Sequence, residues 1–254
     1  MDQISIQEFN QLTDKVFSEL GFTCDWDSSI RSKFCELAFF LLSENEKYNL
    51  TAIRNIEGVI KNHFFDSVSI ASLLPRNAKI IDVGAGPGFP SLPLAIVRPD
   101  LKITSLDSTE KRIRYVEETA NALGLTNVTA VVARAEDHAK LVGERESYDY
   151  ATARAVASLP MLCELTIPFI KIGGFLVAMK SKGASEELEA SRSAIRQLAG
   201  ANSLAKTKLI EKTLLGNVNG ESIEENRSVI IMKKLSATPK TFPRKFAQIK
   251  KCPL

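Results

Sequence analysis

Cysteine and histidine are scarce in this chain of 254 residues, which has four cysteines and two histidines. The cysteines stand far apart with no Cys-x-x-Cys pair, so the spacing typical of a zinc site or a disulfide framework is absent, and we predict no metal. No apolar run approaches the roughly 20 residues that a membrane-spanning helix needs. Residues 1–10 also lack a basic segment followed by an apolar one. These absences predict a cytoplasmic protein with no membrane partner.

A strong net charge is also lacking, since 33 basic and 30 acidic residues leave only +3. With 44% hydrophobic residues, this excludes a disordered chain. The charge is nevertheless uneven: residues 227–254 hold eight basic residues and no acidic one, whereas the first 226 hold 25 basic and 30 acidic. A basic segment on a mildly acidic body predicts a polyanionic partner beside it, with a merely solvated tail as the alternative.

The apolar spacing changes near residue 76. Before it, three helices are predicted, over residues 9–20, 30–41 and 56–74, with Asp27 or Ser28 as the cap of the second. After it, short apolar runs predict strands that alternate with helices. The predicted strands cover residues 79–83, 101–106, 128–132, 148–153, 175–179, 206–210 and 228–232, and the helices between them cover 90–97, 110–123, 136–141, 159–170 and 185–198.

This alternation predicts an α/β protein with a parallel sheet covered on both faces. No helix separates the last two strands, so they are expected to form an antiparallel hairpin at one edge. We divide the chain into an N-terminal helical segment packed on the core (1–75), a Rossmann-like domain (76–235) and a basic C-terminal tail (236–254).

The first strand runs into a glycine-rich loop, Asp-Val-Gly-Ala-Gly-Pro-Gly-Phe-Pro, at residues 82–90. Glycines let the backbone turn sharply and approach a ligand closely. A dinucleotide-binding loop would read G-x-G-x-x-G, which is not the pattern here. Asp82 would repel a pyrophosphate, whereas a carboxylate suits a sulfonium or an α-amino group. The loop therefore favours S-adenosylmethionine over NAD.

Acidic residues also follow the second and third strands. Asp107 ends the second strand, where a carboxylate can accept both ribose hydroxyls or can cap the next helix. Arg134-Ala135-Glu136-Asp137 follows the third strand, where an adenine would lie; Glu136 and Asp137 are alternatively helix caps. Because the carboxyl ends of parallel strands share one edge of the sheet, these turns together predict a nucleoside site.

The fourth strand ends in Ala-Thr-Ala-Arg-Ala-Val, residues 151–156, beside the expected acceptor site. Asn/Asp-Pro-Pro-Tyr and Pro-Cys, which serve amine and pyrimidine C5 methylation, are absent, and Cys163 reads as a core residue. This favours an acceptor that brings its own lone pair, such as guanine N7, with catalysis by positioning and electrostatics and no general base. Arg154 is expected to pair with the cofactor carboxylate, guanine O6 or a neighbouring acid. Lys180 is a candidate phosphate contact, and His63 is predicted to be structural, with a phosphate contact as the alternative.

Several of these segments together resemble the RsmG family, also called GidB, of methyltransferases acting on small-subunit ribosomal RNA. The segments that carry the resemblance are Lys-Tyr-Asn-Leu-Thr-Ala-Ile (47–53), His-Phe-Phe-Asp-Ser (63–67), the glycine loop (81–90), Leu-Asp-Ser (106–108) with Lys111-Arg112, Arg-Ala-Glu (134–136), Thr-Ala-Arg-Ala (152–155), Thr-Pro-Lys (238–240), Phe-Pro-Arg-Lys (242–245) and Pro-Leu (253–254).

The resemblance implies a class I S-adenosylmethionine methyltransferase fold and methylation of guanine N7 in the 530 loop of 16S ribosomal RNA, on naked RNA or on the small subunit. It implies that the cofactor is held by Gly84, Gly86, Phe89, Ala135, Glu136 and Arg154, to which our reading adds Asp107 at the ribose. The expected RNA-binding residues are Lys180, Lys240, Arg244, Lys245, Lys250 and Lys251.

One departure is visible at residues 246–249, Phe-Ala-Gln-Ile, where the family often continues Ala/Pro-Gly-Thr-Pro. The alternatives from the residues themselves are an NAD-dependent oxidoreductase, a non-catalytic RNA-binding or assembly factor, and a methyltransferase acting on a small molecule. Deleting residues 238–254 is expected to weaken RNA binding and its salt dependence while leaving cofactor affinity nearly unchanged.

Overall fold

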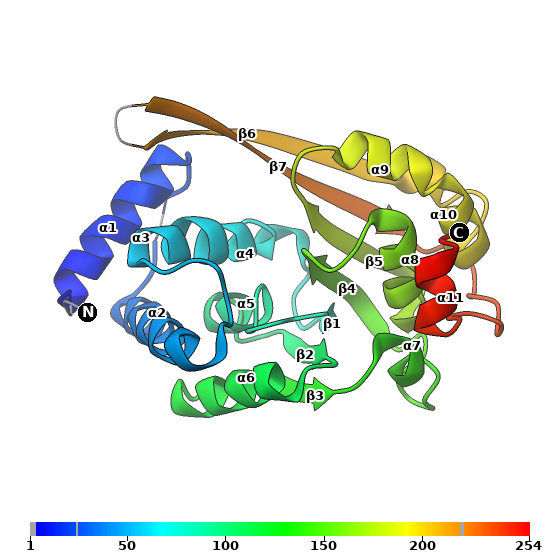
Figure 1. The fold of residues 1–254 in the computed structure, drawn as a ribbon, viewed down its shortest axis with the longest axis horizontal. Coiled ribbons are helices and arrows are strands. Elements are labelled where there is room, and N and C mark those ends of the chain that lie inside the picture. Colours follow the sequence, from blue (N-terminus) through cyan, green and yellow to red (C-terminus); the bar gives the residue numbers. More distant parts are fainter. Residues whose placement is uncertain (1–3, 24, 219–220) are drawn as a thin grey trace.

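The computed structural model describes residues 4–23, 25–218 and 221–254, and these contain one seven-stranded sheet of order β3-β2-β1-β4-β5-β7-β6 (Figure 1). The first five strands are parallel, and β7 is antiparallel to both β5 and β6. The predicted Rossmann-like α/β fold with an antiparallel edge hairpin is therefore confirmed. The strands are β1 Lys79–Val83, β2 Lys102–Asp107, β3 Val128–Val132, β4 Tyr148–Arg154, β5 Ile170–Lys180, β6 Lys208–Val218 and β7 Glu221–Lys233.

Alternate residues of the central strands point to two separate cores. Ile80 packs with the N-terminal helices, α5 and α6, whereas the next residue, Ile81, packs with α8 and α10. The helices of the first side are α1 Ile6–Glu19, α2 Ser28–Tyr48, α3 Ile56–Val59, α4 Asp66–Val68, α5 Ser91–Val97 and α6 Glu110–Ala122. Those of the second are α7 Ala135–His138, α8 Leu159–Thr166, α9 Ala184–Ala190, α10 Arg192–Ala199 and α11 Phe246–Lys251. The predicted division at residues 75/76 and 235/236 stays a prediction.

The prediction of a single helix over residues 56–74 is wrong. The chain runs through α3, a π-helical turn at Ile60–Phe65, α4 and a 3-10 turn at Ala71–Leu73. Apolar spacing predicts which side of a helix is buried but not whether its hydrogen bonds are of the α or the π type. A π-helical turn is therefore not predicted from this spacing. The second helix begins as predicted, with Asp27 accepting a hydrogen bond from the Ile30 amide at 2.8 Å.

Three further boundaries differ from the predictions, each for a hydrogen-bonding reason. The helix predicted over 185–198 divides into α9 and α10 at Ser191, whose hydroxyl bonds the Glu187 carbonyl at 2.6 Å. Gly173 and Gly174 lie inside β5 because both exchange backbone hydrogen bonds with Lys234. The last two strands are longer than the predicted 206–210 and 228–232, since β6 and β7 pair from Lys208 to Val218 and satisfy each other's backbone.

Residues 236–254 fold back onto the side of α8. Ile249 of α11 is fully buried among residues of α8 and α10, and Leu254 packs against the same core. Figure 1 shows α11 beside α7 and α8. Phe246 at the start of α11 lines one cavity with Val83 and Leu106 at the carboxyl ends of β1 and β2. The basic segment therefore lies next to the edge of the sheet at which the sequence places its candidate site.

Candidate functional site: two cavities at the end of the sheet

The glycine loop is tied to the end of β2. The Gly84 and Ala85 amides donate to the Leu106 carbonyl at 2.7 and 3.0 Å, and the Gly86 amide donates to Asp107 Oδ2 at 3.0 Å. Gly84 has φ +72° and faces Val156, so a Cβ here would come within 2.6 Å of a Val156 methyl carbon. Gly86 also has positive φ but has open space where a Cβ would stand. The loop thus leaves room above Gly86 while Gly84 packs tightly.

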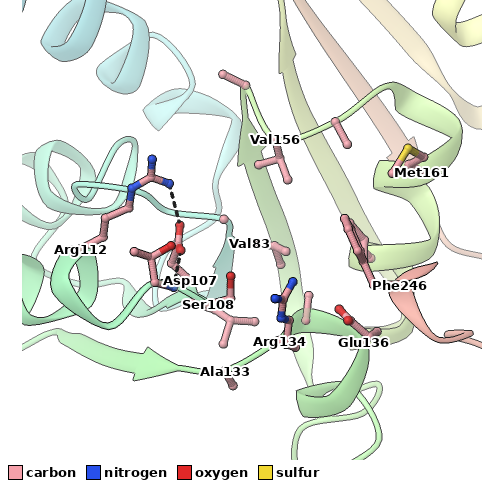
Figure 2. Close-up of a pocket in the computed structure, with 17 residues that line it drawn as sticks. Val83, Asp107, Ser108, Arg112, Ala133, Arg134, Glu136, Val156, Met161 and Phe246 are labelled. Carbon is pink, nitrogen blue, oxygen red and sulfur yellow. Dashed lines mark hydrogen bonds and ion pairs between the residues drawn. The ribbon is translucent and has the colours of Figure 1, made fainter. Parts of the chain in front are cut away.

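A cavity of about 280 Å³ opens beside this loop at the ends of β1, β2 and β3 (Figure 2). Four of the predicted cofactor residues line it: Gly84, Asp107, Ala135 and Glu136. The other lining residues are Val83, Leu106, Ser108, Thr109, Arg112, Ala133, Arg134, Ala155, Val156, Ala157, Met161, Leu165 and Phe246. Asp107 stands at one end of this cavity, and Glu136 stands with Phe246 and Met161 at the other (Figure 2).

Asp107 is held in place from three sides. Its Oδ1 accepts a hydrogen bond from the Thr109 amide at 2.8 Å, and its Oδ2 accepts the one from Gly86. The Arg112 guanidinium lies 3.7 Å from Oδ2. The alternative prediction, that Asp107 caps the next helix, holds only in part, because Thr109 occupies the N-cap position of α6. The carboxylate keeps acceptor capacity toward the cavity.

Glu136, the second acidic residue of this cavity, has fewer hydrogen-bond partners than Asp107. It is buried, yet its carboxylate accepts no hydrogen bond from any residue that the structure describes. The helix-cap alternative for Glu136 and Asp137 is wrong, because Arg134 occupies the N-cap position of α7. Its oxygens are open to the cavity, so a ligand bound there can donate hydrogen bonds to them. Glu136 therefore suits the hydroxyl or amino donors of a nucleoside.

A second, larger cavity of about 740 Å³ adjoins the first and shares its wall of residues 155–157. Ala155 has φ +56°, an unusual conformation for a residue with a Cβ, and it begins the turn that carries Val156 between the cavities. Lys180 holds this wall: its Nζ donates to the Ala157 carbonyl at 2.7 Å and to Glu187 Oε2 at 2.7 Å. Lys180, predicted to contact RNA, thus lines the second cavity.

Arg154 lies in the second cavity, not in the first. Its guanidinium donates to the Asn62 carbonyl at 2.6 Å and to His63 Nδ1 at 2.8 Å, and lies 3.7 Å from Asp66 Oδ2. Burial lowers the pKa of Arg154, but an arginine keeps its charge at neutral pH. On the far side of Asp66, Arg227 Nε donates to Oδ1 at 2.8 Å. Two guanidinium groups therefore share one carboxylate at the floor of this cavity.

The protonation of His63 follows from its partners. A guanidinium can only donate, so Nδ1 accepts from Arg154 and Nε2 carries the proton that goes to Thr51 Oγ1 at 2.9 Å. Burial, together with the Arg154 charge, lowers the pKa of His63 to about 3. The imidazole is thus neutral at physiological pH and fixes Arg154 from behind, and the structural interpretation of His63 agrees with these contacts.

Two residues of the loop lie beneath the cavities. Asp82 does not face a cofactor cation as expected, because it is 1% exposed and both its oxygens accept hydroxyl hydrogen bonds, from Ser91 and Thr152. Burial raises its pKa to about 6. The Phe89 side chain is 3% exposed and stacks on His63 with ring centroids 4.4 Å apart, so only its backbone can serve a ligand.

The basic residues of the C-terminal segment divide into two groups. Arg244 forms a bidentate ion pair with Glu164, a residue of α8 with 0% side-chain exposure. The others are exposed, namely Lys240, Lys245, Lys250 and Lys251. Sequence reasoning missed Phe246 and Met161 in the first cavity and Asp66 and Arg227 in the second. The helical spacing of Phe242, Phe246 and Ile249 was the one available signal for an apolar face in this basic segment.

A Rossmann-like sheet with a cavity beside a glycine loop is typical of S-adenosylmethionine-dependent methyltransferases. Two solved structures share the fold: a precorrin-6y C5,15-methyltransferase from Geobacter metallireducens (TM-score 0.52, 14% identity, 74% of this chain and 92% of that one) and a SAM-dependent O-methyltransferase from Thermotoga maritima (TM-score 0.51, 17% identity, 78% and 73%). At such identities they show the fold alone.

The chain belongs to the GidB family, described as rRNA small subunit methyltransferase G, whose family model matches residues 30–214. Relatives with the name Ribosomal RNA small subunit methyltransferase G include one from Clostridium perfringens, 43% identical over 84% of this chain and 87% of its own length. Another, from Staphylococcus carnosus, is 45% identical over 84% and 86%, and one from Clostridium kluyveri is 36% identical over 97% and 99%.

The predicted family, the enzyme class and S-adenosylmethionine as cofactor are thereby confirmed. In the part of the chain that the structure describes, no helix is long and apolar enough to cross a membrane. The same residues bring together no group of three or more potential metal ligands of the His, Cys, Asp and Glu types. Which residues hold the cofactor, and which atom is methylated, are matters of proposal.

Proposed function

We propose that this protein methylates N7 of a guanine in the 530 loop of 16S ribosomal RNA, acting in the cytoplasm on the RNA or on the small ribosomal subunit. The observation that carries the proposal is the pair of cavities that meet at residues 155–157. One has the size and polarity for the nucleoside of the cofactor, and the other has room and positive charge for a nucleotide of RNA. Methyl transfer requires that the cofactor site and the acceptor site adjoin, so that the methyl group and the acceptor atom come close together.

The residues of the first cavity fit S-adenosylmethionine. The unpartnered Glu136 carboxylate and the acceptor capacity of Asp107 suit amino and hydroxyl donors. Gly86 is not among the lining residues, but open space beside it leaves room for a ligand to approach the loop backbone. When bound, the cofactor supplies an electrophilic methyl group on a sulfonium. In this assignment Asp107 holds the ribose, Ala135 and Glu136 hold the adenine, and the loop from Gly84 to Phe89 contacts the rest through its backbone.

The groups of the second cavity favour an acceptor that has no proton to lose. His63 is neutral and both its nitrogens are engaged, while Asp66 and Glu187 are ion-paired with Arg227 and Lys180. None of the three potential bases, His63, Asp66 and Glu187, is placed as a general base. Guanine N7 carries a lone pair and no proton, so it needs none. Catalysis then consists of holding the guanine in line and stabilising its charge distribution.

The cations of this cavity suit an RNA substrate. Arg154 and Arg227 present guanidinium groups, which bind guanine O6 or phosphate oxygens in a planar fork, and the ion-paired Lys180 also lines the cavity. We assign Arg154 to positioning the guanine, with His63 and the Asn62 carbonyl fixing its orientation. The exposed lysines at 240, 245, 250 and 251 then contact the RNA backbone outside the cavity.

The test measures transfer of a labelled methyl group from S-adenosylmethionine to 16S RNA and to small subunits, with the product mapped by mass spectrometry. We expect label on N7 of one guanine in the 530 loop and a loss of about 10²-fold in kcat/KM for Arg154→Ala, the scale for removing one electrostatic contact. Arg192→Ala, on the exposed side of α10, is the matched control. Label on another atom, or equal rates in the Arg154 and Arg192 variants, would contradict the proposal.

A further inference from the structure

One wall of the first cavity comes from the far end of the chain. Phe246, the first residue of α11, lines the cavity together with Met161 and Leu165 of α8, and Figure 2 shows its ring directed into the space across from Asp107. The Arg134 guanidinium lies 5.8 Å from the centroid of the Phe246 ring. The ring is half-buried: it packs against the core and also lines the cavity. A flat apolar surface is thus presented beside Glu136.

The position of Phe246 is fixed from the preceding residues by a buried ion pair. Glu164 accepts hydrogen bonds from the Arg244 backbone amide at 2.8 Å, from Nε at 2.9 Å and from Nη2 at 2.6 Å. On its other side Ile249, one helical turn later, is fully buried against the second core. Phe246 therefore lies between two anchored residues on a six-residue helix.

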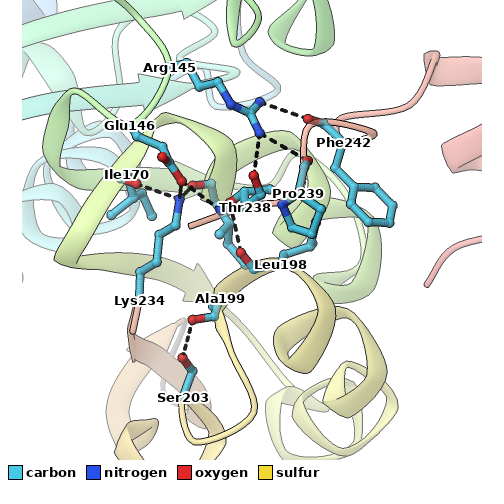
Figure 3. A network of polar contacts seen from close by, with 11 residues as sticks. Arg145, Glu146, Ile170, Leu198, Ala199, Ser203, Lys234, Thr238, Pro239 and Phe242 are labelled. Carbon is cyan, nitrogen blue, oxygen red and sulfur yellow. Dashed lines mark hydrogen bonds and ion pairs between the residues drawn. The ribbon is translucent and has the colours of Figure 1, made fainter. Parts of the chain in front are cut away.

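A second network anchors the approach to this segment (Figure 3). Arg145 donates to the carbonyls of Thr238 at 2.8 Å and Phe242 at 2.9 Å. Glu146 accepts from the Thr238 amide at 2.7 Å and from Lys234 Nζ at 2.6 Å, and the Lys234 side chain is only 1% exposed. Buried ionic contacts of this kind fix geometry more than they add stability. These contacts hold residues 238–242, which lead to Phe246, in a fixed position.

We propose that Phe246 stacks on the adenine of S-adenosylmethionine, so that the basic C-terminal segment forms part of the cofactor site. The inference rests on the proposed cofactor assignment of the first cavity. An adenine needs hydrogen-bond partners at its edge and an apolar surface on its face; Glu136 and the backbone of residues 134–136 offer the first, and the Phe246 ring offers the second. Of the residues lining this cavity, Phe246 alone is aromatic.

The test measures binding of S-adenosylhomocysteine by calorimetry to the full chain and to variants at this position. We expect Phe246→Ala to weaken binding about tenfold, the lower range for losing one base–aromatic stack, and Phe246→Tyr to bind within about twofold of the unchanged protein. Phe246→Leu keeps apolar volume without a π face and should fall between them. In turnover the Ala variant should raise KM for S-adenosylmethionine with little change in kcat. Ala247→Ser, exposed on the same helix, is the control.

The outcomes separate this inference from the assignment on which it rests. If the unchanged protein does not bind S-adenosylhomocysteine, the proposed cofactor site fails. If it binds and the Ala and Leu variants bind equally well, the stacking role of Phe246 is overturned. Should the Ala variant not fold, the Leu and Tyr variants decide: weaker binding by Leu alone supports stacking, and equal affinities overturn it.

Discussion

Replacing Arg244 with methionine is expected to destabilise the whole protein, although this arginine lies in a segment that reads as an RNA-binding tail. The Glu164 side chain, its partner, has 0% exposure, so removal of the guanidinium leaves a buried carboxylate without its counter-ion. Breaking one partner of such a pair costs about 3–5 kcal/mol. The Arg244 side chain is 24% exposed, so water reaches the pair and we expect the lower end, about 3 kcal/mol.

Thermal and urea unfolding at pH 7 measure this loss. For a chain of this size 1 kcal/mol corresponds to roughly 2–4 °C, so Arg244→Met should lower Tm by about 6–12 °C. Adding Glu164→Gln should recover most of the loss, because a neutral amide still accepts from the Arg244 backbone N–H. Lys240→Met, exposed in the same segment, should change stability by less than about 0.5 kcal/mol.

The reasoning is refuted if Arg244→Met unfolds like the unchanged protein while its RNA affinity falls more than that of Lys240→Met. Arg244 would then be a phosphate contact, and the ion pair with Glu164 would contribute little. The same structure changes the expected result of deleting residues 238–254. That deletion removes Ile249, Arg244 and Phe246, so we now expect it to lower stability and cofactor affinity as well as RNA binding.

Asp82→Asn should raise stability at pH 7 by up to about 3 kcal/mol, because burial raises the pKa of Asp82 to about 6 and the folded state holds that proton more tightly than the unfolded chain. Stability of the unchanged protein should accordingly fall as pH rises from about 4 to 6, and urea unfolding across this range should show a flatter profile for the variant. Gly84→Ala should abolish S-adenosylhomocysteine binding in calorimetry, because its Cβ meets Val156, whereas Gly86→Ala, with open space there, should retain weak binding.

The parallel sheet was predictable because buried strands are short apolar runs bounded by turn residues. β1 and β3 have the predicted bounds, and the edge hairpin follows from two strands with no helix between them. What the pattern missed was set by hydrogen bonds that leave no apolar period. The π turn at Ile60–Phe65, the division of a helix at Ser191 and the pairing of Gly173 with Lys234 are all of this kind.

The first cavity was predictable in part because strand ends meet at one edge, which brings Asp107 and Glu136 together. Arg154 was singled out as an arginine among small residues, but its place in the second cavity depends on Asn62 and His63, which lie on an N-terminal helical turn 91–92 residues away in the chain. Chain order does not show which helix faces which strand end. The same limit hid Asp66 and Arg227.

The charge count took the basic residues of 227–254 together, whereas the structure buries some of them and exposes others. Lys234 and Arg244 form ion pairs with Glu146 and Glu164 inside the fold, whereas the exposed lysines face solvent. An inward charge is compensated within the fold and adds little to the field that a polyanion meets, while an outward charge contributes fully. A salt-dependence measurement should therefore show smaller slopes for variants of the four exposed lysines and an unchanged slope for Lys234→Met, provided that this variant is folded.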